Sequence, residues 1–498
     1  MARRPRFLLL ALLSCLLPIT TTRSAQMATP AHTINVALAP DGEALCEDFE
    51  VTVGGNPVPV YSCRVSAMPF NQVWPGYQRP VDQTELAGFA YWDADGSAPV
   101  EVVCHRPIES VEVRPRSFSI TPQVEGNRIR FDLAPPRGVV VEVNGPHGAL
   151  HLFPSPLETD APQAEGPGLI YFGPGVHRPG RVTLESNQTV YIAPGAVVYG
   201  GIHATGASNI KILGRGIIDL SPFERDQGGG NIRLTDCDNI TIDGVVMRDP
   251  DVWCCSLFGC RNATISNVKL IGLWRYNADG IDVCNSQNVT IEDSFIRSFD
   301  DSIVVKGLKF RGDLPVKNIH ARGCVIWNDW GRAFEIGAET CAPEISNVLF
   351  EDSDAIHTVH IALDIQHGDR AAVRNIVFSD IRVETDAHAP APRLQQSPED
   401  TYTEDPQDTF CPHLMVIHIQ GTMWSADTQR GTARNVLFKD IQVLGPVMPT
   451  SFFRGADEQH TVEGVRIESL RFNGEQLTDA GKARLEIGAH VGEVVFER

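Results

Sequence analysis

From residue 169 onward, short runs of alternating apolar and polar residues recur at a nearly constant interval. Each run opens with Asn and continues with mostly β-branched residues, as in Asn239-Ile240-Thr241-Ile242. The runs begin at Asn209, Asn239, Asn262, Asn288, Asn318, Asn347 and Asn375, with Asn435 after a longer gap. Period-two alternation predicts strands, and a repeat of 23 to 30 residues predicts a stacked solenoid.

The repeat shows neither helical periodicity nor the Leu framework of leucine-rich repeats. We therefore predict a right-handed parallel β-helix over residues 169–498, with one repeat in each coil. Coils stack at the ~4.8 Å strand spacing, so residues in the same phase lie above one another. We expect the leading Asn residues to form a ladder whose side-chain amides bond backbone groups at the turn. The step of 60 residues from Asn375 to Asn435 corresponds to about two coils with an insertion.

The chain before the repeat has a different pattern. Residues 26–153 contain short alternating runs such as Phe49-Glu50-Val51-Thr52-Val53, separated by Gly, Pro and Asn turns, which predicts a small β-sandwich domain. Residues 154–168 are rich in Pro, Ala and acidic residues, and we interpret them as a linker. Residues 386–412 form a second Pro-rich acidic stretch, interpreted as an exposed insertion. The predicted fold class is therefore all-β, with a sandwich before a β-helix.

Residues 1–25 have the pattern of an export signal. A positive start of Arg3, Arg4 and Arg6 is followed by an apolar stretch, and small residues allow cleavage after Ser24 or Ala25. Cys15 offers an alternative, because Leu12-Leu13-Ser14-Cys15 could be a lipoprotein cleavage site. The sequence thus predicts a secreted or periplasmic protein, and no later run is long and apolar enough to span a bilayer.

The net charge of −20 restricts the partners, because an acidic surface repels polyanions and makes nucleic acid unsuitable. Eleven Cys remain outside the predicted signal, an odd number without zinc spacing, and buried free thiols are the expectation. We expect no cofactor and no bound metal at His or Cys. The oligomeric state is not indicated.

Adjacent carboxylates concentrate in two neighbouring coils. Aligning Asp279-Gly280-Ile281-Asp282-Val283 with Asp301-Ser302-Ile303-Val304-Val305 matches the apolar positions at an offset of 22 residues, one coil. Asp279 and Asp301 should therefore stack, with Asp300 beside them. Repulsion should keep at least one of the three protonated, and an acid beside ionised bases is what glycoside hydrolysis requires. A calcium site is the structural alternative for three carboxylates.

Outward positions of the same strands supply candidates for substrate contact. A plain solvated sheet face would also be polar, but it would not concentrate carboxylates in this way. The candidates are Asn277, Asp282, Lys306, Arg332, Glu335, Asp364, Gln366 and Trp253. Stacked coils would align them as one polar stripe with an aromatic member.

The run Asn277-Ala278-Asp279-Gly280-Ile281-Asp282, followed by Asp300-Asp301, resembles the Asn-Thr-Asp and Asp-Asp motifs of glycoside hydrolase family 28, the polygalacturonases. The resemblance covers about residues 165–380. It implies hydrolysis of O-glycosyl bonds with inversion of configuration, with Asp300 as general acid and Asp279 and Asp301 activating water. The sandwich before the helix resembles, more distantly, the dextranases of family 49, which act on neutral α-glucans.

Two positions depart from the family 28 pattern. Its Gly-His-Gly falls near Gly331-Arg332-Ala333, and its Arg-Ile-Lys falls near Asp364-Ile365-Gln366. The resemblance implies that this second pair of cations would hold a uronate carboxylate, so their loss predicts an uncharged sugar rather than homogalacturonan. Two alternatives stay open: a β-helix polysaccharide lyase using Lys306 or Arg332, and a non-catalytic carbohydrate-binding β-helix.

Overall fold

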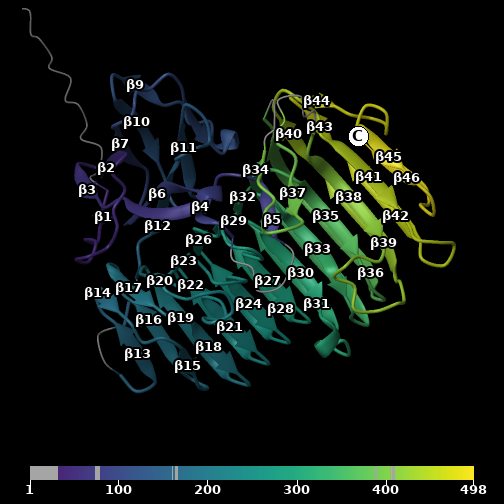
Figure 1. Ribbon diagram of the computed structural model, residues 1–498, viewed down its shortest axis with the longest axis horizontal. Helices are drawn as coiled ribbons and strands as arrows, with labels where there is room; N and C mark the ends of the chain where they lie inside the picture. The colour runs from purple at the N-terminus through teal and green to yellow at the C-terminus, as the bar shows by residue number, and fades with distance from the viewer. Residues whose placement is uncertain are drawn as a thin grey trace, which may run out of the picture.

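The computed structural model describes residues 32–72, 79–159, 161–162, 166–386, 390–403, 405 and 410–497. The predicted export signal, with Cys15, lies outside these residues. Strands dominate the described chain (Figure 1), and helical structure is limited to three short 3-10 turns, η1 Val81–Gln83, η2 Arg116–Phe118 and η3 Lys309–Arg311. No helix in the described ranges is long and apolar enough to cross a membrane.

The N-terminal part of the chain forms two packed sheets, here called the sandwich domain. One sheet contains β1 Ile34–Asn35, β4 Tyr61–Ser66, β6 Thr84–Ala94, β8 Val111–Arg114, β11 Val139–Val143 and β12 Leu150–Pro156. The other contains β2 Phe49–Val53, β3 Asn56–Val58, β7 Ala98–Cys104, β9 Gln123–Glu125 and β10 Arg128–Leu133. Alternate residues of both sheets, such as Val53, Val102 and Val141, fill the core between them. β12 pairs with β6 as far as Pro156, so the domain extends three residues into the predicted linker.

The rest of the chain winds into a parallel β-helix of two long sheets. The 11-stranded sheet contains β15 Val182–Leu184, β18 Ile202–Thr205, β21 Ile232–Thr235, β24 Cys255–Phe258, β27 Ile281–Cys284, β30 Ile303–Gly307, β33 Arg332–Thr340, β35 Ile361–His367, β38 His413–Ile419, β41 Thr450–Arg454 and β45 Leu485–Ile487. The all-β class and the parallel β-helix are confirmed.

The second, 22-stranded sheet carries the two remaining strands of most coils. It contains β13 Leu169–Phe172, β14 Gly175–His177, β16 Thr189–Ile192, β17 Ala196–Tyr199, β19 Ser208–Gly214, β20 Ile217–Asp219, β22 Asp238–Asp243, β23 Val246–Arg248, β25 Arg261–Ser266, β26 Lys269–Ile271, β28 Gln287–Glu292, β29 Phe295–Ser298, β31 Val316–Arg322, β32 Val325–Asn328, β34 Glu344–Thr358, β36 Ala372–Glu384, β39 Thr432–Lys439, β40 Gln442–Leu444, β42 Val462–Glu468, β43 Arg471–Phe472, β44 Glu475–Gln476 and β46 Val494–Glu497. The sandwich domain packs against it through a second apolar cluster that includes Phe153, Phe295 and Trp327.

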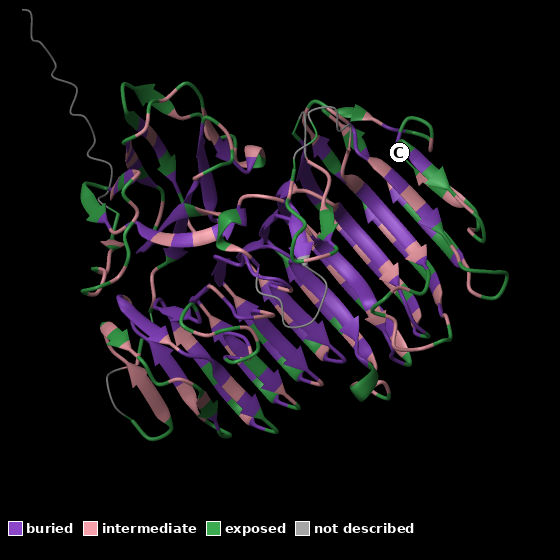
Figure 2. Cartoon of the chain, in the orientation of Figure 1, coloured by how far each residue is buried: buried purple, intermediate pink, exposed green. Residues whose placement is uncertain are grey.

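The predicted coil register is confirmed. Ile281 pairs with Ile303, and Val283 pairs with Val305. All four side chains are fully buried in one core that runs the length of the helix, and buried residues dominate the middle coils (Figure 2). All eleven Cys outside the predicted signal are free thiols, nine of them buried.

The Asn ladder exists, but the predicted acceptors are wrong. Except at Asn262, the amide nitrogen of each ladder Asn donates to the side-chain oxygen of the Asn one coil earlier, as from Asn239 to Asn209 at 2.6 Å and from Asn318 to Asn288 at 2.9 Å. Asn262 instead donates to Asp238 at 2.7 Å. The ladder residues have left-handed φ near 57°, a conformation that Asn tolerates well. This backbone turns the amides outward, where they meet one another.

The 60-residue step is one coil with a long insertion, which corrects the prediction of two. β36 pairs directly with β39, and Asn435 donates to Asn375 at 3.3 Å. Within the insertion, residues 387–389, 404 and 406–409 lie outside the described residues. Its strand β37, Arg393–Gln395, pairs with β5, Phe70–Gln72, of the N-terminal part of the chain.

Candidate active site

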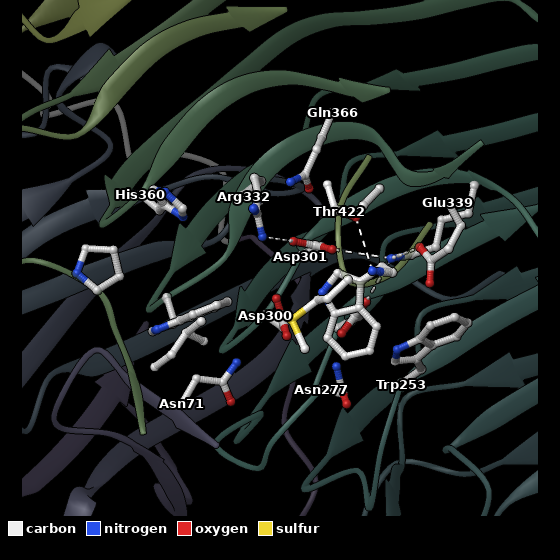
Figure 3. Close-up of a pocket in the computed structure, with 18 of the residues that line it drawn as sticks. Asn71, Trp253, Asn277, Asp300, Asp301, Arg332, Glu339, His360, Gln366 and Thr422 are labelled. Atoms are coloured by element: carbon white, nitrogen blue, oxygen red, sulfur yellow. Dashed lines mark hydrogen bonds and ion pairs between the residues drawn. The ribbon is translucent and has the colours of Figure 1, made fainter. Parts of the chain in front are cut away.

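A pocket of about 520 Å³ lies over the outer face of the 11-stranded sheet, around β27, β30 and β33 (Figure 3). It is lined by Asn71, Arg225, Val252, Trp253, Asn277, Asp279, Asp300, Asp301, Lys306, Trp330, Arg332, Ala338, Glu339, His360, Gln366, Pro392, Leu394, Thr422, Met423 and Trp424. The pocket therefore brings together the three predicted catalytic Asp residues and five of the eight predicted substrate-binding residues. Those five are Asn277, Lys306, Arg332, Gln366 and Trp253.

The three Asp side chains precede two stacked strands. Asp279 stands before β27, and Asp300 and Asp301 stand before β30. The amide of Gly280 donates to the carbonyl of Asp301 at 2.8 Å, which ties the two coils together at this point. A Cβ on Gly280 would clash with the carbonyl oxygen of Ser302, so glycine permits this close approach.

Buried polar side chains hold the backbone of Asp300. Its carbonyl oxygen accepts from the Ser298 hydroxyl at 2.7 Å and from the Asn328 amide at 2.7 Å. Gly331 approaches from the next coil, where an added Cβ would come within 2.6 Å of the Asp300 carbonyl carbon. The Asp300 carboxyl is thus mounted on a fixed backbone.

Burial and neighbouring charges shift the pKa values of Asp300 and Asp301 in opposite directions, so that one can act as an acid and the other as a base. Burial, reinforced by the charge of Asp301, raises the pKa of Asp300 to about 7. Burial alone would also raise the pKa of Asp301, but the charges of Lys306 and Arg332 outweigh it and the pKa is lowered. At neutral pH Asp300 therefore retains a proton for much of the time while Asp301 is ionised. Burial and the neighbouring Asp282 raise the pKa of Asp279 well above its usual value.

Lys306 is the cation at the centre of the carboxylates. Its Nζ lies 3.5 Å from Asp279, 3.4 Å from Asp301 and 3.5 Å from Glu339, and 5.1 Å from the ring centroid of Trp253. Burial would lower the pKa of Lys306, but the surrounding carboxylates raise it well above its usual value. The part of the chain that the structure describes contains no group of three His, Cys, Asp or Glu side chains placed to hold a metal ion.

Asp282, Glu335 and Asp364 are not among the lining residues, and their expected contact with substrate stays a prediction. They share one row of the sheet and are fully buried. Arg332 connects this row to the pocket, since its Nε lies 3.4 Å from Asp364 and its Nη1 lies 3.7 Å from Asp301. Burial raises the pKa of Glu335 well above its usual value. The buried carboxyls are thus placed to tune Asp301.

Several lining residues could not be identified from the repeat. Asn71 comes from the N-terminal part of the chain, more than 200 residues before the Asp cluster, and Leu394 comes from the insertion. Met423 and Trp424 follow β38 and are 65% and 41% exposed although they line the pocket. The exposed aromatic ring offers a surface on which a sugar ring can stack. The only sequence signal is an apolar pair in a polar loop, and it does not show which face the loop covers.

Residues 201–392 match the family model described as Glycosyl hydrolases family 28. The resemblance to family 28 is thereby confirmed. Polygalacturonase QRT2 of Arabidopsis thaliana is 24% identical over 154 residues, which cover 30% of this chain and 33% of that protein. Probable rhamnogalacturonase A of Aspergillus oryzae is 24% identical over 147 residues, 30% of this chain and 29% of that protein. The chain thus matches about a third of the length of these curated relatives, and the family 28 segment contains all three Asp residues.

The likeness to solved structures extends beyond the family 28 segment. Dex49A from Penicillium minioluteum superposes with a TM-score of 0.65 at 16% identity, covering 93% of this chain and 96% of that chain. At this identity the likeness shows the fold alone. The shared fold includes the part before the β-helix, and the more distant resemblance to family 49 is confirmed at this level.

Proposed function

We propose that the protein is an exported glycoside hydrolase that cleaves a polysaccharide or oligosaccharide with inversion of configuration. The observation that carries the proposal is the pairing of Asp300, whose pKa is raised to about 7, with the ionised Asp301 in one pocket. An acid and a base with separated pKa values are the requirement for protonating a leaving group while activating water. The family 28 match over the same residues supports this chemistry.

In the proposed reaction, Asp300 gives its proton to the glycosidic oxygen as the bond to the anomeric carbon breaks. A water molecule attacks that carbon from the opposite face, and Asp301 accepts the proton that the water loses. Asp279 positions this water from the other side of the Lys306 ammonium, which lies 3.4 to 3.5 Å from both carboxyls. Afterwards Asp300 is ionised and Asp301 protonated, and exchange with solvent restores both.

The substrate is proposed to be uncharged at the cleavage site, because the cations lining the pocket already have anionic partners. Lys306 contacts three carboxylates, and Arg332 contacts Asp301 and Asp364. Arg225 donates to Asn277 at 2.9 Å, and its Nε lies 3.6 Å from Asp226. A uronate carboxylate would find no uncompensated cation among these three, whereas Gln366 can donate to and accept from sugar hydroxyls.

A panel of neutral and acidic polysaccharides tests the activity, with reducing ends as the readout. We expect release from a neutral glycan and little from polygalacturonic acid. Asp300→Asn should lower turnover by orders of magnitude, while Asp313→Asn, an exposed carboxylate outside the pocket, should leave it unchanged. Proton NMR of the first product anomer tests inversion.

Three results would contradict the proposal. Near-wild-type turnover in Asp300→Asn would remove the proposed acid. Efficient hydrolysis of polygalacturonic acid would overturn the uncharged substrate. A product with an ultraviolet-absorbing double bond would indicate a lyase instead. Export is tested separately by N-terminal mass spectrometry, where a start after Ser24 or Ala25 supports a cleaved signal and a lipid on Cys15 indicates a lipoprotein.

A further inference from the structure

The N-terminal part of the chain reaches across to the pocket through a short two-stranded sheet. β5 runs parallel to β37 of the insertion, with Asn71 opposite Leu394. The amide of Arg393 also donates to the carbonyl of Pro69 at 2.9 Å. Both Asn71 and Leu394 line the pocket. One wall of the site is therefore built from two segments that are far apart in sequence and lie outside the regular coils.

This wall is anchored beside the proposed acid. The guanidinium of Arg79 lies 4.0 Å from the ring centroid of Phe299, the residue immediately before Asp300. Arg79 also donates to the carbonyl of Trp274 at 3.2 Å and to the side chain of Gln83 at 3.2 Å, and it is only 2% exposed. Arg79 also donates to the carbonyl of Met68, two residues before β5, so the strand that carries Asn71 is attached through Arg79 to the coils of the β-helix.

A second anchor holds the partner strand. The indole nitrogen of Trp330 donates to the carbonyl of Arg393 at 3.2 Å, and its ring stacks on Phe299 at 6.1 Å. The same Phe299 ring therefore touches both Arg79 and Trp330. The two strands of the wall are fixed relative to the Asp300 backbone, so side chains on the wall keep a constant position over the site.

Within the described part of the chain, the amide oxygen of Asn71 has no hydrogen-bond partner. The residue is 2% exposed, and its Oδ1 is buried without a hydrogen bond among the described residues. Buried amide groups are normally paired, because an unpaired one loses its water without replacement. Figure 3 shows the carboxamide facing the pocket on the same side as Asp300. The carboxamide therefore lies at the edge of the space that a bound sugar would fill, with its nitrogen on the Asp300 side.

We propose that Asn71 is a substrate-binding residue, and that the N-terminal part of the chain completes the active site by placing it there. This inference rests on the proposed function and specifies the substrate further. Oδ1 accepts a hydrogen bond from a sugar hydroxyl, and Nδ2 can donate to a neighbouring oxygen. A hydroxyl brings the proton that Oδ1 needs, whereas a carboxylate does not. Asn71 therefore binds a hydroxyl of the sugar close to the acid.

The test compares Asn71→Ala with Asn127→Ala, an exposed Asn of the sandwich domain outside the pocket. We expect kcat/KM to fall about tenfold in Asn71→Ala, the effect of one lost hydrogen bond to substrate, and to stay unchanged in Asn127→Ala. The unfolding temperature of Asn71→Ala should not fall, because Oδ1 has no hydrogen-bond partner to lose among the described residues. A lowered unfolding temperature with unchanged kcat/KM would show a structural role and overturn the inference.

Asn71→Asp gives a second readout. It keeps an acceptor oxygen but adds a negative charge on the Asp300 side of the pocket, which should raise the pKa of Asp300. The alkaline limb of the kcat/KM profile should therefore move to higher pH. An unmoved limb would show that the side chain does not face the reacting groups.

Sugar binding to inactive enzyme separates this inference from the proposed function. Isothermal calorimetry compares Asp300→Asn with the Asp300→Asn/Asn71→Ala double variant, using neutral oligosaccharides from the panel. A Kd about tenfold weaker in the double variant supports the role of Asn71 even if the wild-type protein hydrolyses nothing. Equal affinities overturn the role even if hydrolysis is confirmed, and an absence of binding to every oligosaccharide overturns both.

Discussion

Lys306 is the cation that contacts the carboxylates of the site, so its replacement by an uncharged residue tests quantitatively how it affects their pKa values. Lys306→Met keeps the apolar stem and deletes an ammonium that lies 3.4 to 3.5 Å from Asp279, Asp301 and Glu339. An opposite charge at this distance typically lowers a carboxyl pKa by about 1–3 units. Since Asp301 must be ionised to act as base, the acid limb of the kcat/KM profile should move up by about this amount.

The same substitution should lower stability in a pH-dependent way. Leaving buried carboxylates without their cation typically costs about 3–5 kcal/mol at neutral pH. The depressed pKa of Asp301 contributes stability above its unfolded value that is lost as the pH falls through the folded pKa. In the variant the folded pKa values rise, so that contribution disappears and ionisation becomes a penalty. The deficit relative to wild type should therefore shrink as the pH falls towards about 4.

Guanidinium denaturation followed by tryptophan fluorescence measures the deficit at each pH, and initial rates give the kcat/KM profile. Lys211→Met is the matched control, because Lys211 is exposed on β19 and outside the pocket. It should change neither quantity. An acid limb that stays in place in Lys306→Met, together with a deficit that does not depend on pH, would refute the assignment of Lys306 as the counter-charge of Asp301.

Three further substitutions test the core, the acid and the ladder. Ile303→Ala should lower the free energy of unfolding by about 2–5 kcal/mol, because the side chain is fully buried, and a loss below about 1 kcal/mol would contradict the packing. Arg332→Leu should raise the pKa of Asp300 above about 7, because the Arg332 charge lowers that pKa. The alkaline limb of the kcat/KM profile should therefore move to higher pH. A shift to lower pH would contradict the assignment of Asp300 as the acid. Asn318→Ala should cost about 2–3 kcal/mol in thermal or chemical unfolding, because it removes amide bonds to two neighbouring Asn residues and places Ala at φ 57°; an unchanged protein would show that the ladder does not stabilise the coils.

The fold was predictable because one repeat pattern indicates both where the strands lie and how the strands of successive coils pair. The match of Ile281 with Ile303 fixes every neighbouring position, and so it also placed Asp279 over Asp301. The same alternation did not predict how deeply the outward-facing side chains are buried. It shows that Asp282 and Glu335 point outward, but both are fully buried, among charged side chains of neighbouring coils such as Lys306. Asn71 was not predictable for a related reason, since no periodicity connects the N-terminal part of the chain to the coil that it touches.

The repeat pattern also did not predict which groups accept the hydrogen bonds of the Asn ladder, or how long the insertion is. A leading Asn in each coil predicts stacking, but the choice between backbone and side-chain acceptors depends on the left-handed φ of the ladder residues. A gap of 60 residues fits one coil or two equally well by length. Only the direct pairing of β36 with β39 decides between them.

The insertion between β36 and β39 shows how this architecture separates variation from catalysis. The chain leaves the stack after Glu384 and rejoins it at β38, which pairs with β35, and Asn435 then lies in phase on Asn375. The cost of closing such an excursion grows only by about 0.6 kcal/mol with each doubling of its length. Segments between coils can therefore lengthen, shorten or be exchanged while the carboxyl groups below keep their spacing. Grafting a different insertion at this point offers a route to new glycan preferences on an unchanged hydrolytic centre.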